Sequence, residues 1–212
     1  MTHSKRARRP TRRIRIRRIR AAGLLVVIAA IAADLGYQLL ASSSSTAASP
    51  IDVLRGEHRG AFGEADGVVP DGTTVFDDET PGVANLDPDL LGALRQAATD
   101  AAGDGVEFFV DSGWRSPEYQ NQLLREAVSE YGSEAEAAQW VATPHASAHV
   151  SGDAVDIGPF DATAWLSEHG AEFGLCQIYG NEPWHYELRP EAIDRGCPPM
   201  YADPTHDPRM QR

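Results

Sequence analysis

The spacing of apolar and polar positions predicts one domain of mixed helices and strands. Leu90, Leu94 and Ala98 recur at helical spacing after Asp87, a residue type that caps the start of helices. A short unbroken apolar run such as 106–110 is typical of a buried strand. We expect helices at 88–103, 117–131, 134–141 and 162–173, and strands at 74–76, 106–110, 154–157, 175–179 and 184–188. The fold is therefore predicted to be α+β, a small antiparallel sheet with helices packed on one side.

The first 41 residues show a different pattern, a basic stretch followed by an apolar one. Residues 1–20 hold ten of the chain's 19 Lys and Arg residues, and residues 21–33 are apolar or small. This layout is typical of a secretory signal or a signal anchor. The positive-inside rule then places the chain after residue 41 outside the cytoplasm. A basic arm that binds nucleic acid is the alternative, but it gives the adjacent apolar run no role.

Whether this segment is cleaved or retained depends on Asp34. Residues 21–33, if helical, span only about 20 Å of a hydrocarbon core that is roughly 30 Å thick. A helix extended to Ala41 is long enough, but it places Asp34 inside the membrane at a cost of about 2.5–3.5 kcal/mol. We expect a membrane anchor over residues 21–41, with a cleaved signal peptide as the alternative. Residues 42–50, rich in Ser and Ala, are expected to form a tether.

The rest of the chain is strongly acidic and contains the predicted domain, residues 51–200. Beyond residue 50 there are nine Lys and Arg residues against 30 Asp and Glu residues, a net charge of −21. Such a domain is not expected to bind nucleic acid, because it cannot neutralise phosphates. From Pro198 the chain is polar and rich in proline, and we expect this tail, assigned to residues 201–212, to have little order.

The chain has two cysteines, Cys176 and Cys197. In an oxidising compartment they are expected to form one disulfide. It would close a loop of about 20 residues and contribute on the order of 3 kcal/mol in the chain-entropy model. Two thiolate metal ligands are the alternative, but no Cys-x-x-Cys spacing supports them.

Two histidines and two carboxylates lie in short segments of the second half. His149 and Asp156 are seven residues apart, and Glu182 precedes His185 by three. Two imidazoles and one carboxylate form a donor set that zinc takes when it keeps one position open. A further carboxylate suits the base that a metal-activated water requires. Alternate residues of a strand share a face, so Asp156 and His185 can meet at one ion if their two strands are neighbours.

Each of these residues also has an ordinary structural interpretation. His149 could be a loop histidine, Asp156 a cap, His185 a core histidine and Glu182 a solvated acid. Their joint occurrence, at spacings that can converge, favours the metal site.

Arg115 follows the strand predicted at 106–110 and precedes a predicted helix. Its guanidinium could there offer a fixed fork to a carboxylate or to a developing oxyanion. A surface salt bridge is the alternative in so acidic a domain. His145 is expected beside the site or in a loop, and no role is assigned to His58, His169 and His206.

Three motifs together resemble the VanY-type D-alanyl-D-alanine carboxypeptidases. They are Ser-Gly-Trp-Arg-Ser-Pro-Glu-Tyr-Gln at 112–120, Ser-x-His-x-x-Gly-x-Ala-x-Asp at 147–156 and Glu-Pro-Trp-His-Tyr at 182–186. The resemblance covers about residues 85–190. These enzymes are zinc metallopeptidases of the bacterial cell wall. The resemblance implies the core fold that they share with the hedgehog signalling domain.

The resemblance also implies a role for each matching residue. His149, Asp156 and His185 would bind zinc. Glu182 would act as the general base and later as the acid for the leaving amine.

Further matches concern the substrate. Arg115 would stabilise the substrate carbonyl as it becomes an oxyanion, and Gln120 and Ser147 match positions that contact substrate in relatives. Trp114 stands where tyrosine is common, and Ala148 stands where glutamate often precedes the histidine. Neither departure removes a metal ligand, but both leave the choice of substrate open.

We therefore expect a zinc-dependent carboxypeptidase outside the cytoplasm that removes the terminal D-alanine from peptidoglycan stem peptides. The site residues do not separate it from an L,D-carboxypeptidase or a cell-wall endopeptidase. A zinc-bearing binding module without activity is an alternative of another class, against which Glu182 and Arg115 argue. The sequence predicts no particular oligomeric state.

Overall fold

The computed structural model describes residues 62–211, which belong to one compact unit, Val53–Arg212. The predicted basic segment 1–20, membrane segment 21–41 and tether 42–50 lie outside the described residues. The described part of the chain contains no helix with the length and hydrophobicity that a bilayer crossing requires.

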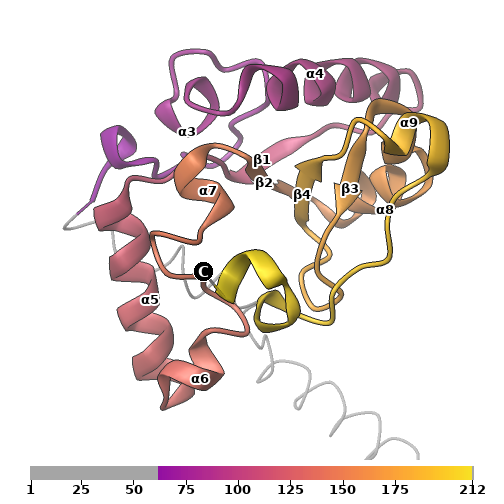
Figure 1. Ribbon diagram of the computed structural model, residues 1–212. Coiled ribbons are helices and arrows are strands. Elements are labelled where there is room, and N and C mark those ends of the chain that lie inside the picture. Colours follow the sequence, from indigo (N-terminus) through magenta and orange to yellow (C-terminus); the bar gives the residue numbers. More distant parts are fainter. Residues whose placement is uncertain (1–61, 212) are drawn as a thin grey trace, which may run out of the picture. The chain divides into compact units, whose positions relative to one another are not determined.

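Four antiparallel strands form a sheet in the middle of this unit (Figure 1). The strands are β1 (Phe109–Ser112), β2 (Ala154–Gly158), β3 (Leu175–Gln177) and β4 (His185–Leu188), in the order β1-β2-β4-β3. Because β2 lies between β1 and β4, the register opposes Asp156 to Ser112 on one side and to His185 on the other. The predicted α+β fold with a small antiparallel sheet is confirmed.

Helices cover one face of the sheet and enclose the main core. They are α4 (Pro88–Gly103), α8 (Phe160–His169) and the short 3-10 helix η2 (Gly170–Phe173). The predicted cap of α4 is present, because the Asp87 side chain accepts hydrogen bonds from the first backbone N–H groups of the helix. Val155, Ile157 and Tyr186 of the sheet pack into this core.

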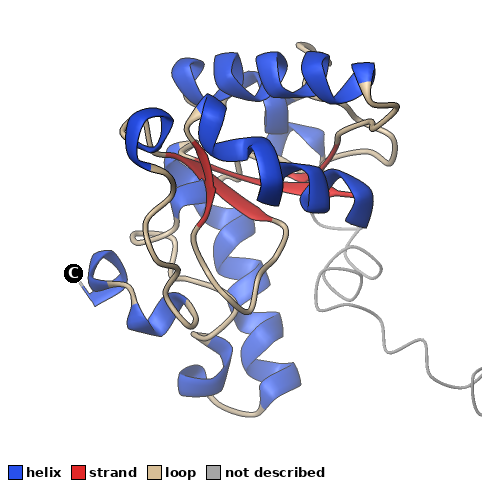
Figure 2. Cartoon of the chain, turned by 90° about the vertical axis from the view of Figure 1, so that its right-hand side faces the viewer, coloured by secondary structure: helices blue, strands red, loops and turns tan. Residues whose placement is uncertain are grey.

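Helices α5 (Pro117–Tyr131) and α6 (Glu134–Ala137) lie on the opposite side of the sheet from α4 (Figures 1 and 2). They form a second, smaller core that includes Leu123, Ala127 and Val141. The Ser116 hydroxyl caps α5 and accepts a hydrogen bond from the backbone N–H of Tyr119 at 3.1 Å. The helix predicted at 117–131 is therefore confirmed, and it begins at Pro117.

The remaining elements are short. They are η1 (Glu64–Asp66), α3 (Pro81–Ala84), α7 (Ala148–Ser151), α9 (Ala192–Arg195), η3 (Pro204–His206) and η4 (Pro208–Gln211). The predicted disulfide joins Cys176 of β3 to Cys197, which follows α9. The loop that it closes contains β4, so both flanks of that strand are tied together.

Strand β1 begins later than predicted, at Phe109 rather than at residue 106. Its partner β2 ends at Gly158, which lies opposite Phe109. The next residue, Pro159, has no N–H group with which to continue the ladder. Nearby, the strand predicted at 74–76 is reduced to an isolated bridge between Thr74 and Phe109.

The helix predicted at 134–141 ends at Ala137. Two residues later, the backbone carbonyl of Gln139 accepts a hydrogen bond from the Asn181 side chain at 2.8 Å. This carbonyl therefore accepts from a residue distant in sequence, and the local spacing of apolar residues does not predict such a contact.

The tail after Pro198, expected to have little order, packs against the domain. Tyr201 forms a parallel bridge with Tyr179, and η3 and η4 follow. Arg209 then forms an ion pair with the buried Glu187 of β4. The ordered structure of this tail could not be predicted from the sequence. Main-chain hydrogen bonds and charged side-chain contacts hold it, and these leave no apolar face with a regular period.

Candidate metal centre

Three potential metal ligands converge on one point beside the sheet. His149, Asp156 and His185 each direct one ligand atom to it, and these atoms all lie within 4.8 Å of one another. The exposed fractions of the three residues are 6%, 3% and 4%, so the cluster is shielded from bulk water. Strand pairing accounts for two of the three, because Asp156 and His185 are register partners on β2 and β4.

His149 reaches the cluster from the short helix α7. This helix ends at Gly152, whose φ of +82° is the left-handed conformation that glycine adopts without strain. A Cβ atom at Gly152 would lie 2.5 Å from the carbonyl oxygen of Asn85, so only glycine fits against that backbone. Gly152 thus lets the chain turn from α7 toward β2.

Hydrogen bonds fix which ring nitrogen of each histidine faces the cluster. Nδ1 of His149 lies 2.9 Å from the carbonyl oxygen of Gly113, which can only accept, so this nitrogen carries the proton. Nε2 of His185 donates in the same way to the Glu187 carboxylate at 3.3 Å. The other two ring nitrogens then face each other at 3.3 Å. Such outer hydrogen bonds are the usual means of orienting histidines that bind metals.

The resulting arrangement requires a positive charge at its centre. Nδ1 of His185 and Nε2 of His149 lie 3.2 and 3.4 Å from the same oxygen of Asp156. With their outer nitrogens protonated, all three inner atoms are acceptors, which repel one another unless a cation or a proton lies among them. Two imidazole nitrogens and one carboxylate oxygen match the donor set of a zinc site with an open position. The residues present therefore fit zinc.

The pKa values of the three residues are shifted by burial and by their charged neighbours. Burial alone would lower the pKa of His185, but hydrogen bonds with Asp156 and Glu187 raise it to about 10. Burial and the charge of Arg115 lower the pKa of His149. Burial opposes the ionisation of Asp156, yet His149, His185 and Arg115 hold its pKa well below its usual range. Hydrogen bonds with two carboxylates thus favour a proton on His185 over one on His149.

Glu182 lies at the edge of the cluster, as predicted. One of its carboxylate oxygens is 3.7 Å from Nδ1 of His185, and the other, Oε1, has no hydrogen-bond partner among the described residues. Burial, supported by the charge of Asp156, raises the pKa of Glu182 to about 7. A buried carboxylate with a free oxygen and such a pKa can both take and return a proton near neutral pH.

Arg115 is buried and belongs to the site rather than to a surface salt bridge. Its Nη2 donates to Asp156 at 2.9 Å, and its Nε donates to the Ser112 hydroxyl at 2.7 Å. Its Nη1 donates to Gln120 at 3.1 Å, while the Gln120 amide nitrogen donates to the carbonyl of Ala142 at 2.9 Å. Gln120 therefore holds the guanidinium in place, and two of the five N–H groups of Arg115 remain for another acceptor.

Ser147 and four further histidines complete the set of candidate residues. Ser147 is buried at the start of α7, where its side chain makes no capping hydrogen bond. His145 is exposed in the loop before it, as expected. His169 lies in α8 and His206 in η3, and neither belongs to the cluster. His58 lies outside the described residues.

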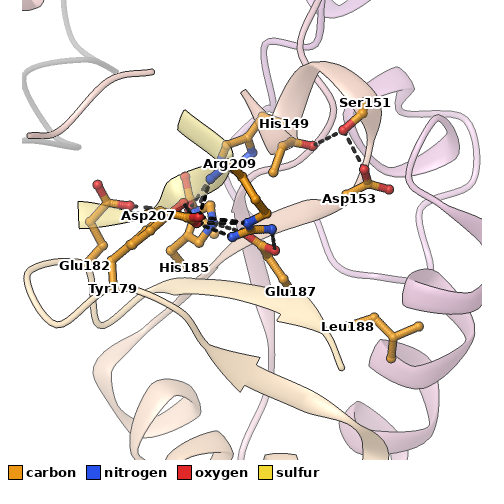
Figure 3. Close-up of polar contacts among 12 residues, drawn as sticks. His149, Ser151, Asp153, Tyr179, Glu182, His185, Glu187, Leu188, Asp207 and Arg209 are labelled. Carbon is orange, nitrogen blue, oxygen red and sulfur yellow. Dashed lines mark hydrogen bonds and ion pairs between the residues drawn. The ribbon is translucent and has the colours of Figure 1, made fainter. Parts of the chain in front are cut away.

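Glu187 is the residue of this site to which sequence reasoning assigned no role. It is two positions after His185 on the same face of β4, and that spacing is the signal that could have identified it. Its exposed fraction is 1%, and it contacts the outer nitrogen of His185 (Figure 3). The pair Asp156 and Glu187 thus holds His185 from both sides of its ring.

Comparison with known proteins gives the following relationships. Residues 83–191 match the family model described as "VanY: D-alanyl-D-alanine carboxypeptidase". A D-alanyl-D-alanine carboxypeptidase of Enterococcus faecalis (strain ATCC 700802 / V583) is 36% identical, over 44% of this chain and 44% of that protein. The chain therefore matches less than half the length of this relative.

Two solved structures are also similar. A mutant of the vancomycin-resistance D,D-pentapeptidase VanY in complex with Zn(II) is 32% identical. The match covers 49% of this chain and 72% of that one, with a TM-score of 0.46. The L,D-carboxypeptidase LdcB is 24% identical, over 63% of this chain and 73% of that one, with a TM-score of 0.49. Because both TM-scores lie below 0.5, the relationship is carried by the family model and the sequence identity.

Zinc binding to the metal-free chain is expected to release at least one proton at pH 8, because ligands must be deprotonated to bind a metal. The pKa of His185 is raised to about 10, so the proton is present below that pH and is lost above it. Glu182, with a pKa of about 7, is already mostly ionised at pH 8. Isothermal titration calorimetry in two buffers with different ionisation enthalpies counts the protons released.

The matched control is His169→Ala, which removes a histidine of α8 outside the cluster and should leave the proton count unchanged. A release near zero at pH 8 in the unaltered chain would contradict the protonated state of His185.

Proposed function

The chain belongs to the VanY family of D-alanyl-D-alanine carboxypeptidases, and on that basis we propose that it is a zinc-dependent carboxypeptidase. Its proposed substrates are peptidoglycan stem peptides, from which it removes the terminal D-alanine. The observation that carries this proposal is the buried convergence of His149, Asp156 and His185, with the unpartnered carboxylate oxygen of Glu182 beside it.

His149, Asp156 and His185 are the residues that would hold the metal. When bound, zinc supplies a Lewis acid that polarises a carbonyl group and lowers the pKa of a coordinated water to about 7. Gly113 and Glu187 fix the ring nitrogens of the two histidines, and Arg115 bonds Asp156, so contacts within the protein orient all three ligands.

Glu182 is proposed to move the proton in both halves of the reaction. Its carboxylate takes a proton from the attacking water, whose oxygen bonds to the carbonyl carbon of the penultimate residue. The carbon–nitrogen bond then breaks, and Glu182 returns the proton to the amine of the leaving D-alanine. Its buried position and the oxygen that has no hydrogen-bond partner among the described residues suit both roles.

Arg115 is proposed to stabilise the negative charge that develops on the carbonyl oxygen. Three of its N–H groups are fixed by Ser112, Gln120 and Asp156, so the guanidinium cannot turn away, and two N–H groups remain for substrate. Gln120, which the resemblance matched to a substrate contact, acts in this scheme by holding Arg115. Ser147, buried at the start of α7, is the proposed further contact to substrate.

The same site serves related reactions, which differ in the peptide rather than in the chemistry. An L,D-carboxypeptidase or a cell-wall endopeptidase would use the same five residues at the reacting centre. A zinc-bearing module without activity would need neither the unpartnered oxygen of Glu182 nor the constrained guanidinium of Arg115. The geometry therefore favours hydrolysis over binding alone.

The proposed location is outside the cytoplasm, with residues 21–41 serving as a membrane anchor or as an export signal. The proposed substrate, a cell-wall peptide, lies in that compartment. A reporter enzyme that folds only outside the cytoplasm, fused after residue 212, should be active with the full chain and inactive when residues 1–41 are deleted. Equal reporter activity in both fusions would contradict this location.

Glu182→Gln is expected to lower kcat on a stem pentapeptide by about 10²–10⁴-fold, the usual contribution of a positioned acid–base group. Zinc content should stay at the level of the unaltered chain, because Glu182 is not among the three converging ligands. Release of D-alanine and mass spectrometry of the remaining peptide give the rate and identify the bond that is cut.

The matched control is Glu191→Gln, which removes an exposed carboxylate and should leave kcat unchanged. If the unaltered chain released no product, or if Glu182→Gln kept full activity, the catalytic role would be wrong. Loss of a dipeptide or a cross-linked fragment instead of alanine would identify the alternative reaction.

Arg115→Lys is expected to lower kcat by about 10²–10³-fold, as for the loss of one oxyanion donor. Lysine keeps the charge but cannot bond Ser112, Gln120 and Asp156 at once, so the remaining N–H groups lose their fixed direction. Arg125→Lys, an exposed exchange on α5, is the control. Steady-state kinetics showing a change in KM alone would assign Arg115 to binding rather than to charge stabilisation.

A further inference from the structure

The C-terminal segment reaches back to the strand that carries His185. Arg209 of η4 donates from Nη1 to Oε2 of Glu187 at 2.6 Å and from Nη2 to Oε1 at 3.1 Å. Figure 3 shows Arg209 and Asp207, both from this segment, beside His185 and Glu187 of β4. The carboxylate of Glu187 therefore connects Arg209 to the candidate metal ligand His185.

Glu187 depends on such partners because it is almost fully buried. A carboxylate with an exposed fraction of 1% is costly unless its charge is paired and its oxygens are hydrogen-bonded. Arg209 meets this need with a two-pronged contact, one nitrogen to each oxygen, which fixes the plane of the carboxylate as well as its charge. The orientation of Glu187 in turn sets the direction in which it accepts the Nε2–H of His185.

Two arginines, Arg189 and Arg209, bond the carboxylate of Glu187, but of the two only Arg209 bonds both of its oxygens. Arg189, at the end of β4, bonds only Oε2, at 2.6 Å. Arg209 bonds Oε2 and also Oε1, the oxygen that accepts from His185. Arg209 is therefore the partner whose position controls the hydrogen bond to the metal ligand.

Arg209 is itself fixed within its segment. Its Nε lies 2.9 Å and its Nη2 2.5 Å from Oδ2 of Asp207, a residue with an exposed fraction of 0%. The hydroxyl of Tyr179, in the loop between β3 and β4, donates to the same oxygen at 3.0 Å. The guanidinium thus has a single defined orientation, which a flexible surface arginine would lack.

We propose that Arg209 is a positioning residue of the metal centre, which orients His185 through Glu187 and makes the C-terminal segment part of the active site. This inference rests on the proposed function, because it assumes that His185 binds the metal. Residues that hydrogen-bond a metal ligand directly, as Glu187 does, typically affect metal affinity or activity by about 10–100-fold, and Arg209 acts through that contact.

The test measures zinc affinity of the full chain, by competition with a chromophoric chelator after removal of metal. Arg209→Met should weaken zinc binding by about ten-fold or more. Arg209→Lys should also weaken it, because lysine keeps the charge but not the fork. Arg189→Met is the matched control, with the same loss of charge beside the same carboxylate, and it should have a clearly smaller effect.

A second arm places Arg209→Met in a Glu187→Gln background. If Arg209 acts through Glu187, the double variant should bind zinc no more weakly than Glu187→Gln alone. Additive losses would overturn the proposed route. Thermal unfolding of the metal-free variants is measured in parallel, and a lower melting temperature with unchanged zinc affinity would reduce Arg209 to a structural contact.

The positioning role of Arg209 and the proposed function can be contradicted by different results. Unchanged zinc affinity in Arg209→Met, or an equal loss in Arg189→Met, would overturn the positioning role and leave the proposed function intact. If Arg209→Met does not fold, Arg209→Lys decides, and unchanged affinity in that variant overturns the role. A full chain that binds no zinc at all would overturn the proposed function, and the positioning role with it.

Discussion

Three acceptor atoms that point at one another inside a protein are stable only if a positive charge lies among them, and the site is organised around this constraint. The inner nitrogens of His149 and His185 face each other and one oxygen of Asp156 at 3.2–3.4 Å. A proton on His185 meets this requirement, and hydrogen bonds with Asp156 and Glu187 raise the pKa of His185 to about 10. A divalent metal would satisfy it with more charge, and the buried surroundings would strengthen the attraction.

Two series of hydrogen-bonded side chains connect the metal centre to the surrounding elements. On one side Asp156 is bonded to Arg115, and Arg115 to Gln120, which is anchored on the carbonyl of Ala142. On the other side His185 is bonded to Glu187, and Glu187 to Arg209 of the C-terminal segment. Both series end on segments far from β2 and β4 in sequence. In this strongly acidic domain, two of the few arginines thus pair with the buried carboxylates Asp156 and Glu187.

The alternation of side chains along the strands separates this polar site from the apolar core. Val155, Ile157 and Tyr186 point to the face covered by α4 and α8 and belong to the main core. Asp156 and His185 occupy the intervening positions and meet at the site on the other face. Packing of the core therefore holds the ligands in register, because a slip of one residue would exchange the two faces.

The sequence by itself determined the longer helices, most of the sheet strands and the residues that converge at the candidate site. Asp87 and Ser116 mark the starts of their helices through local capping, and His149, Asp156, Glu182 and His185 are recognisable by type and spacing. The tertiary structure alone decided which acceptor orients each histidine, that Gln120 holds Arg115, and that the C-terminal segment is ordered. These features depend on contacts between residues distant in sequence, such as Arg209 with Glu187 and Asn181 with Gln139. No local periodicity encodes them, because a single charged or amide contact leaves no repeating pattern in the chain.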